Sequence, residues 1–204
     1  MSVRDIISNL RESLSGGVVP FKEMKVMVVG EPAVGKTTML RVLYGQTSRD
    51  LATRPSVATD GIDLGEVTLD DFRLTFWDFA GQEVYRYTHQ LFLSDNSLCL
   101  VMYRVTTPDE EARHQLMYWM DSVFQRAPNA MCLLVGTCAR NFPEVYAESR
   151  VREHLGHLQY RYGQRVCGGV AIDSMFNYGF PALRKELLRM SMSKVRGFSS
   201  LVWL

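Results

Sequence analysis

The chain alternates between short apolar runs and longer stretches in which apolar and polar positions mix. Four of the runs are apolar almost without interruption, which is typical of central parallel strands with both faces buried. Two further runs, joined by Asp70-Asp71, alternate between apolar and polar residues and predict a hairpin. The six predicted strands are residues 24–29, 62–69, 72–77, 97–103, 130–137 and 166–172.

The stretches between these runs are long enough for helices that cross from one strand to the next. Helical periodicity covers residues 37–44 and 180–191, and a third helix opens at Pro108 with an acidic first turn. Packing explains the apolar stripe of this third helix, which consists of Leu116, Trp119, Met120, Val123 and Phe124. Residues 45–60 show little periodicity and predict a long loop. The pattern therefore predicts an α/β fold with a mainly parallel six-stranded sheet flanked by helices.

The two ends of the chain lie outside this alternation. Residues 1–21 predict a short amphipathic helix and a Gly-containing linker, so the α/β domain is expected over residues 22–192. Residues 193–204 end in apolar side chains with no evident polar cover. This end is expected to pack on its own domain, to form an oligomer contact or to continue into a longer protein, and we favour the last.

Composition is that of a soluble globular domain of 204 residues, 47% hydrophobic and 22% charged. No run of about 18 apolar residues is available to span a bilayer, so we expect no membrane insertion. The formal net charge of +1 gives no field that would collect nucleic acid. Four scattered cysteines without a C-x-x-C pair predict buried, reduced thiols and a cytoplasmic protein.

The strongest chemical motif lies where the first predicted strand meets the first helix. The pattern G-x-x-x-x-G-K-[ST] is matched in full, in the strand-to-helix context that its mechanism requires. Its backbone N–H groups can point at phosphate oxygens, Lys36 places a cation on the β- and γ-phosphates, and Thr37 offers a hydroxyl to Mg²⁺. The candidate nucleotide-binding residues here are Gly30, Glu31, Pro32, Ala33, Val34, Gly35, Lys36, Thr37 and Thr38.

A second motif, D-F-A-G-Q-E, follows the second strand of the predicted hairpin. The carboxyl ends of strands are where open α/β sheets place ligands, so Asp78 is expected to hold Mg²⁺. Gly81 can bring its N–H close to a γ-phosphate, and Gln82 is the candidate catalytic residue, placed to orient a water for in-line attack. D-x-x-G alone is a weak motif, and its distance after the first motif strengthens this interpretation.

Two segments resemble the Roc domain, the Ras-like GTPase module of Roco proteins: D-F-A-G-Q-E-V-Y-R-Y-T-H-Q from Asp78 and A-T-D-G-I-D from Ala58. The resemblance implies a Ras-like P-loop NTPase fold with GTP and GDP as ligands and Mg²⁺ as cofactor. It implies that Thr59 is the switch residue that contacts Mg²⁺ when a γ-phosphate is present. Roc domains occur beside a COR dimerisation domain, so it also implies an adjacent COR domain, approached through residues 193–204, and a homodimer of the parent protein.

The segment that would recognise the base departs from this family. Roc domains commonly carry T-H-x-D here, and the Asp accepts hydrogen bonds from the guanine edge. Thr137 fits the pattern, but Cys138 replaces the His, and Arg140, a donor with no acceptor, replaces the carboxylate. Losing such an acceptor costs about 3 kcal/mol or more, which is roughly 100-fold in affinity. Asn141 and Asp173 are nearby substitutes outside the expected register.

Hydrolysis is expected to be slow. Pro32 stands where Ras-type GTPases need a small residue near the γ-phosphate, and proline removes an N–H donor. The favoured interpretation is a guanine-nucleotide switch in which the ligand reorders the loop around Thr59 and the segment after Gly81. Two alternatives stay open. One is a pseudo-GTPase scaffold with weak, unselective or absent nucleotide binding, and the other is a P-loop ATPase, against which the Ras-like order of motifs counts.

Overall fold

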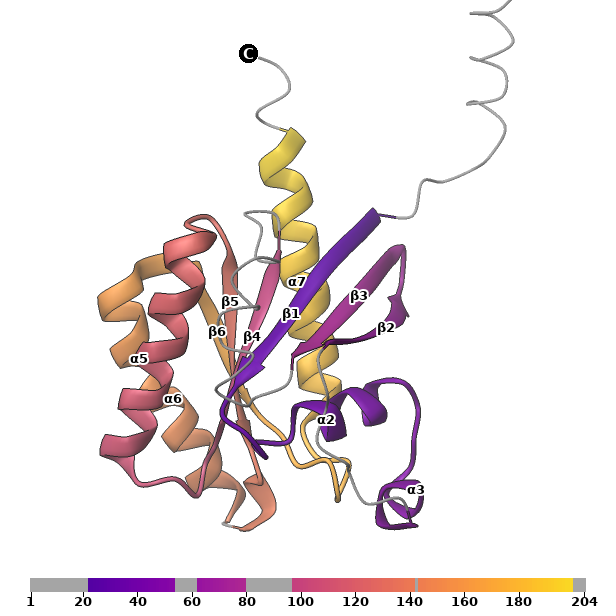
Figure 1. The fold of residues 1–204 in the computed structure, drawn as a ribbon, viewed down its shortest axis with the longest axis vertical. Helices are drawn as coiled ribbons and strands as arrows, with labels where there is room; N and C mark the ends of the chain where they lie inside the picture. Colours follow the sequence, from indigo (N-terminus) through magenta and orange to yellow (C-terminus); the bar gives the residue numbers. More distant parts are fainter. Residues whose placement is uncertain (1–21, 54–61, 80–96, 142, 200–204) are drawn as a thin grey trace, which may run out of the picture.

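The computed structural model describes residues 22–53, 62–79, 97–141 and 143–199. Their six strands form one sheet in the order β2-β3-β1-β4-β5-β6 (Figure 1). The β2–β3 pair is antiparallel and the other neighbouring pairs are parallel, so the predicted mainly parallel six-stranded sheet is confirmed. The strands are β1 (Lys22–Gly30), β2 (Ile62–Leu69), β3 (Phe72–Phe79), β4 (Leu98–Arg104), β5 (Met131–Thr137) and β6 (Val166–Ala171).

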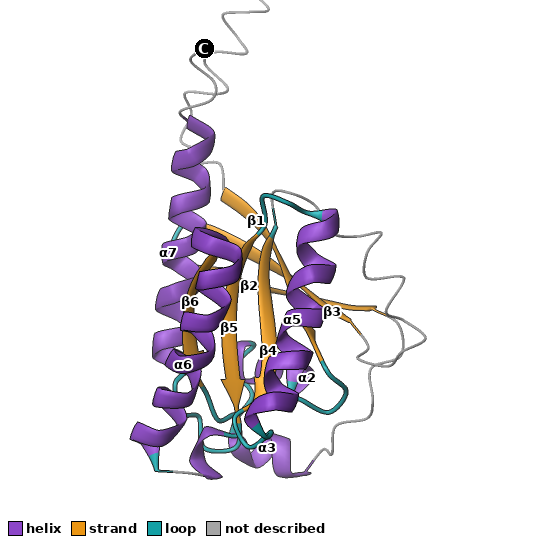
Figure 2. Cartoon of the chain, turned by 90° about the vertical axis from the view of Figure 1, so that its left-hand side faces the viewer, coloured by secondary structure: helices purple, strands orange, loops and turns teal. Residues whose placement is uncertain are grey.

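Helices cover both faces of the sheet (Figures 1 and 2). Helices α5 and α6 lie on one face, and α2 and α7 lie on the other. The helices are α2 (Lys36–Leu43), α3 (Ser48–Thr53), α5 (Asp109–Arg126), α6 (Glu144–Tyr162) and α7 (Phe180–Ser199), with short 3₁₀ turns η2 (Ala139–Asn141) and η3 (Gly163–Arg165). Across the described ranges, none of these helices combines the length and the apolar character needed to cross a membrane.

The central strand β1 explains why its sequence is apolar without alternation. Met27 and Val29 join the core cluster beneath α5 and α6. Val26 and Val28 join the cluster on the opposite face, beneath α2 and α7. Because both faces of the strand are buried, every position favours an apolar side chain. The predicted stripe of α5 is likewise confirmed, since all five of its residues are buried.

The long loop predicted over residues 45–60 is wrong in its first half, which contains the helix α3. Thr47 and Asp50 form a reciprocal cap at its start. The Thr47 backbone N–H donates to Asp50 Oδ2 at 2.8 Å, and the Asp50 N–H donates to Thr47 Oγ1 at 3.4 Å. Leu51 is buried against the core. A six-residue helix with one capping pair and one buried apolar residue is too short to show helical periodicity in the sequence.

The last helix is longer than predicted, since it continues past residue 191 to Ser199. Ser191 is fully buried, and its hydroxyl donates to the Leu187 carbonyl at 2.8 Å, so a polar residue interrupts the apolar pattern without interrupting the helix. Beyond it, Lys194 Nζ donates to the Asn129 carbonyl at 2.7 Å, and Val195 packs against the core. These contacts explain why the helix continues.

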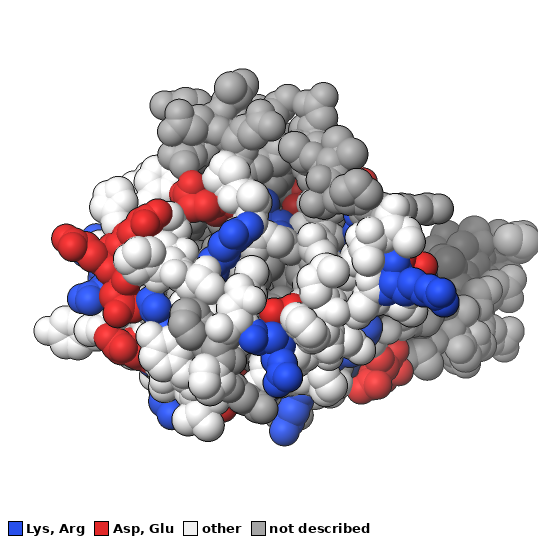
Figure 3. Space-filling model, turned by 90° about the horizontal axis from the view of Figure 1, so that it is seen from below, with Lys and Arg blue, Asp and Glu red and all other residues white. Residues whose placement is uncertain are grey.

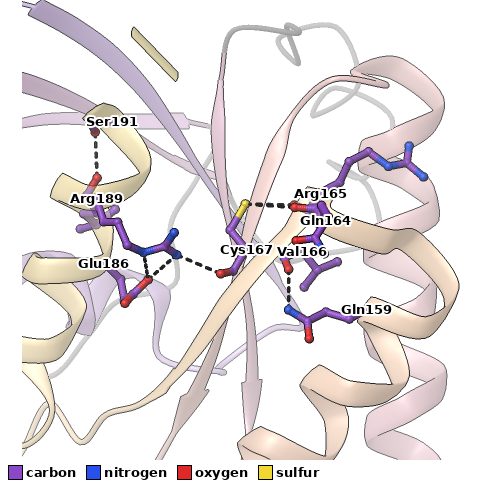
Figure 4. Close-up of polar contacts among 9 residues, drawn as sticks. Gln159, Gln164, Arg165, Val166, Cys167, Glu186, Arg189 and Ser191 are labelled. Carbon is purple, nitrogen blue, oxygen red and sulfur yellow. Dashed lines mark hydrogen bonds and ion pairs between the residues drawn. The ribbon is translucent and has the colours of Figure 1, made fainter. Parts of the chain in front are cut away.

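Side chains from α6 and α7 hold the edge strand β6 (Figure 4). Gln159 Nε2 donates to the Val166 carbonyl at 2.9 Å. Arg189 Nη2 donates to the Cys167 carbonyl at 2.9 Å while its guanidinium pairs with Glu186. Carbonyl oxygens at the exposed edge of a sheet need partners, and these two donors supply them.

All four cysteines are free thiols, but they are not all buried as predicted. Cys99 and Cys132 are fully buried, whereas Cys138 and Cys167 are half-buried. Cys167 lies on the edge strand, where only one neighbouring strand covers it, and Cys138 lies in a turn after β5. An apolar sequence run therefore predicted the strand correctly but not its place at the edge of the sheet.

Candidate nucleotide-binding site

The motifs identified in the sequence converge at the carboxyl ends of the parallel strands, the edge where open α/β sheets bind ligands. Gly30 ends β1, Thr137 ends β5, and Asp78 lies one residue before the end of β3. Figure 3 views the molecule from this side and shows acidic and basic side chains interspersed among the residues that it colours. Recognition here therefore depends on individual groups rather than on a field of one sign.

The loop between β1 and α2 has a backbone that needs glycine. Gly30 has φ +148°, and a Cβ at this position would collide with the carbonyl of Met102 on β4. Gly35 has φ +99° and is the N-cap of α2, which has no side-chain cap of its own. The N-terminus of α2, the end of a helix that favours anions, therefore lies directly after the loop. Ala33, at φ +57°, shows that this loop holds a non-glycine residue in a strained conformation.

Lys36 lies inside this loop with 7% of its surface exposed. Its ammonium donates to the Gly30 carbonyl at 2.9 Å and to the Glu31 carbonyl at 3.0 Å. Burial lowers the pKa of Lys36 to about 8, against the opposing attraction of the Asp78 and Glu31 carboxylates. The ammonium is therefore charged at neutral pH and placed at the centre of the phosphate loop.

Thr37 and Asp78 come together although 41 positions separate them in the sequence. The Thr37 hydroxyl donates to Asp78 Oδ2 at 2.5 Å, and Asp78 is 1% exposed, opposite Val28 in the β1–β3 ladder. A hydroxyl and one carboxylate are hard oxygen donors of the kind with which Mg²⁺ completes its shell beside substrate phosphates. Within the described ranges there is no group of three or more His, Cys, Asp or Glu that could hold a metal ion by itself.

Two further side chains hold the phosphate loop from outside, and sequence analysis did not assign either to the site. Arg104, at the end of β4, donates through Nε and Nη2 to the Ala33 carbonyl at 3.1 and 2.5 Å. Trp119 Nε1, on α5, donates to the Glu31 carboxylate at 3.1 Å. The sequence did contain one indication for Trp119. Its indole N–H is a donor in a buried stripe of apolar residues, so it needs a hydrogen-bond acceptor from outside that stripe.

Thr137 links this phosphate end to the segment expected to recognise the base. Its hydroxyl contacts the Val34 carbonyl at 2.8 Å and the Tyr103 carbonyl at 3.2 Å, and the residue is 5% exposed. Cys138 follows with φ +59°, a left-handed conformation that a non-glycine residue rarely adopts. The chain then turns through η2, which exposes Arg140.

Asp173 joins the loop after β6 to this turn. Its Oδ2 accepts the backbone N–H of Arg140 at 3.2 Å, and its Oδ1 accepts the N–H of Met175 at 3.1 Å. The carboxylate is 5% exposed, so it fixes two loops against each other. The Arg140 guanidinium lies 6.0 Å from the ring centroid of Phe176, an exposed residue of the second loop.

The structure thus places most of the sequence-predicted residues along one edge of the sheet. Thr38 is half-buried in the first turn of α2, and Pro32 is exposed in the phosphate loop. Thr59, Gly81 and Gln82 lie outside the described residues, so their roles stay predictions. Arg140 stands where the family has a carboxylate. The nearby carboxylate of Asp173 accepts hydrogen bonds from the backbone amides of Arg140 and Met175.

Comparison with known proteins gives one family and several relatives. The family model described as "Ras of Complex, Roc, domain of DAPkinase" matches residues 25–139, more than half of the chain. The chain is 28% identical over 214 residues to the protein named "Probable serine/threonine-protein kinase pats1" of Dictyostelium discoideum, covering 95% of this chain and 7% of that protein. It is 31% identical over 129 residues to leucine-rich repeat serine/threonine-protein kinase 1 of Caenorhabditis elegans, covering 57% and 5%. The chain spans less than a tenth of either relative.

A solved structure shares the fold. The structure of Methanosarcina barkeri Roco2 RocCORdC bound to GDP superposes with a TM-score of 0.65 at 24% sequence identity, over 85% of this chain and 50% of that one. At this level of identity the likeness concerns the fold. Together with the match to the Roc family model, it confirms the predicted Ras-like P-loop fold class.

Proposed function

The chain belongs to the Roc domain family of Roco proteins, and on this basis we propose that it is a Mg²⁺-dependent guanine-nucleotide switch with slow GTP hydrolysis. The observation that supports this proposal most strongly is the phosphate loop. Its glycines have the φ angles that the wrap requires, and Lys36 and the Thr37–Asp78 pair stand at its centre. The GDP in the Methanosarcina barkeri structure is a ligand of the same chemical class.

In the proposed function, each residue has one task. The loop amides and Lys36 bind the β- and γ-phosphates, and Thr37 and Asp78 would hold Mg²⁺, which neutralises phosphate charge when bound. We propose that Thr59 completes the metal shell in the GTP state. We propose Gly81 as the γ-phosphate contact and Gln82 as the residue that orients the attacking water. Pro32 supplies no N–H, which supports a slow intrinsic rate.

A second candidate function, a pseudo-GTPase scaffold, is favoured by one observation. Arg140 presents an exposed guanidinium where a guanine-specific site would present a carboxylate acceptor. With the base contact weakened, nucleotide would bind through its phosphates alone or not at all. The two functions therefore make opposite predictions about occupancy at physiological nucleotide concentrations.

Calorimetric titration of the 204-residue chain with GDP, GTP, ADP and ATP in the presence of Mg²⁺ separates these functions. A switch requires micromolar or tighter binding of guanine nucleotides, followed by measurable release of phosphate from GTP. Absence of binding by all four nucleotides would contradict the switch and support the scaffold. Preference for ATP would favour the third function, a P-loop ATPase.

We further propose the context in which this domain works. Residues 22–192 would form the switch itself, preceded by a helix and linker over residues 1–21 and followed from residue 193 by the connection to a COR domain. The Methanosarcina barkeri structure is named as a RocCOR protein, which supports a COR neighbour. A homodimer of the parent protein and a cytoplasmic location belong to the same proposal. Size-exclusion chromatography with light scattering of this chain tests whether dimerisation needs the neighbouring domain.

A further inference from the structure

Two side chains hold consecutive carbonyls of the phosphate loop from outside. Arg104 and Thr137 form the last pair of the β4–β5 ladder, so they stand side by side. The Arg104 guanidinium donates through Nε and Nη2 to the Ala33 carbonyl at 3.1 and 2.5 Å. The Thr137 hydroxyl lies 2.8 Å from the Val34 carbonyl oxygen. The ends of two neighbouring strands therefore fix two successive peptide units of the loop.

The N–H of the first of these peptide units faces the inside of the loop. In a planar trans peptide the C=O and the following N–H point in opposite directions, so a carbonyl held from outside turns its N–H inward. The Val34 N–H accordingly donates to the Glu31 carbonyl at 3.4 Å, and the same carbonyl accepts the Lys36 ammonium at 3.0 Å. The N–H bond is longer than the usual range of about 2.7–3.2 Å, so it is weak. A phosphate oxygen beside the ammonium can replace it.

Ala33 is the strained residue of the loop. Its φ of +57° lies in the left-handed region, which a residue with a side chain adopts only when its surroundings hold it there. Both hydrogen bonds from Arg104 end on the carbonyl of this residue, so they fix the direction that the left-handed conformation gives to it. A charged donor also polarises the peptide unit that it binds, which makes the N–H on the opposite side a stronger donor.

We propose that Arg104 is a positioning residue for phosphate binding: it holds Ala33 in the left-handed conformation and thereby keeps the Val34 N–H turned into the loop before a nucleotide arrives. This inference rests on the proposed function, in which the loop binds phosphates. Arg104 acts through the loop rather than on the ligand. Without Arg104 the loop can relax at Ala33, and binding must then restore the strained conformation, which should weaken nucleotide binding about tenfold.

Calorimetric titration of the 204-residue chain with GDP and Mg²⁺ tests the proposal. Arg104→Ala is expected to bind GDP about tenfold more weakly than the wild-type chain. Arg184→Ala is the matched control, because it removes a guanidinium-to-carbonyl hydrogen bond of the same kind, to Leu43 at the other end of α2. This control should bind GDP within about twofold of the wild-type chain.

A second substitution, Ala33→Gly, separates positioning from general support of the fold. Glycine adopts a left-handed conformation without strain, so it needs no side chain to hold it there. In the Ala33→Gly chain, Arg104→Ala should therefore weaken GDP binding only about twofold. General support of the fold would instead cost the same in both backgrounds. Because Arg104 is exposed, thermal unfolding of the nucleotide-free Arg104→Ala chain should stay within about 3 °C of the wild-type chain.

The outcomes separate this inference from the function on which it rests. Equal GDP affinities of Arg104→Ala and the wild-type chain would overturn the inference and leave the nucleotide switch standing. A tenfold loss that persists in the Ala33→Gly background would also overturn it, and so would an equal loss in Arg184→Ala. Each of these results would assign the effect to something other than the held carbonyl. Failure of the wild-type chain to bind GDP would overturn the proposed function and the inference together.

Discussion

In the proposed function, the phosphate end and the base end of the site would contact a ligand with different parts of the chain. At the phosphate end, the loop backbone is fixed by two glycines and by contacts from Arg104 and Trp119. At the proposed base end, one exposed side chain, Arg140, lies at the surface of a short turn. A Cβ at Gly30 would collide with the carbonyl of Met102 on the neighbouring strand, whereas the side chain of Arg140 is exposed. Contacts that the backbone would make with phosphates therefore depend on the fold, whereas a contact made by an exposed side chain can change without altering the backbone.

The largest effect is expected from Lys36→Met, which removes the buried cation at the centre of the phosphate loop. Because a hydrogen bond to a charged group is worth about 1.5–3 kcal/mol and this ammonium would contact two phosphates in the proposed complex, the affinity for every nucleotide should fall about 100-fold or more. Calorimetry with GDP and with inosine diphosphate measures this loss. An equal loss for both nucleotides is expected, and a loss confined to one base would contradict the separation of the two ends.

Asp78→Asn tests the metal contribution at the phosphate end. The amide is the same size as the carboxylate but carries no charge, so Mg²⁺ should raise GDP affinity about tenfold less than in the wild-type chain. Titrations with Mg²⁺ and with excess EDTA give the increment due to the metal. If the increment is unchanged in Asp78→Asn, the metal is held elsewhere. Affinity in EDTA serves as the control for the fold.

The pH dependence of binding tests the buried ammonium. The pKa of Lys36 is lowered to about 8 in the free protein, chiefly by burial, and phosphate anions would raise it again in the complex. Above pH 8 binding must therefore also take up a proton, so affinity should fall about fivefold between pH 8 and pH 9 and stay nearly constant below pH 7. Lys36→Met should lack this step. The same step in that variant would assign it to another group.

The smallest effect concerns the outer support of the loop. Trp119→Phe removes the hydrogen bond to Glu31 and should cost about 1 kcal/mol of stability, with a decrease in nucleotide affinity of about two- to fourfold. Glu31→Gln keeps an oxygen acceptor and is the matched control. Thermal unfolding and calorimetry measure both quantities. Equal losses in the two variants would show that the negative charge of Glu31, rather than the hydrogen bond, supports the loop.

Much of the fold could be predicted from the sequence because burial on both faces leaves a direct pattern. The central strand β1 is apolar at consecutive positions, and the stripe of α5 recurs at helical spacing. The prediction failed where the deciding contact involves few residues. Helix α3 depends on the Thr47–Asp50 cap, and α7 passes through a buried Ser191 that bonds within its own helix.

The site could be predicted only as far as its motifs are local in sequence. The phosphate loop is contiguous, so its members were assigned together. Arg104 and Trp119 contact that loop from 71 and 88 positions away, and no spacing rule connects them to it. Asp173 was recognised as a carboxylate near the base, but its hydrogen bonds to two backbone amides could not be derived from residue identity.

The hydrogen bond between Trp119 and Glu31 also couples the phosphate loop to the fluorescence of a tryptophan. The indole is 3% exposed, and its N–H ends on a residue of the loop itself. Trp77, by contrast, lies on β3 beneath the ammonium of Lys25, 3.8 Å from the ring centroid. Indole emission depends on the hydrogen bond at its nitrogen, so a movement of the loop changes the intrinsic fluorescence of Trp119 directly. The protein therefore carries an intrinsic fluorophore that is hydrogen-bonded to the phosphate loop.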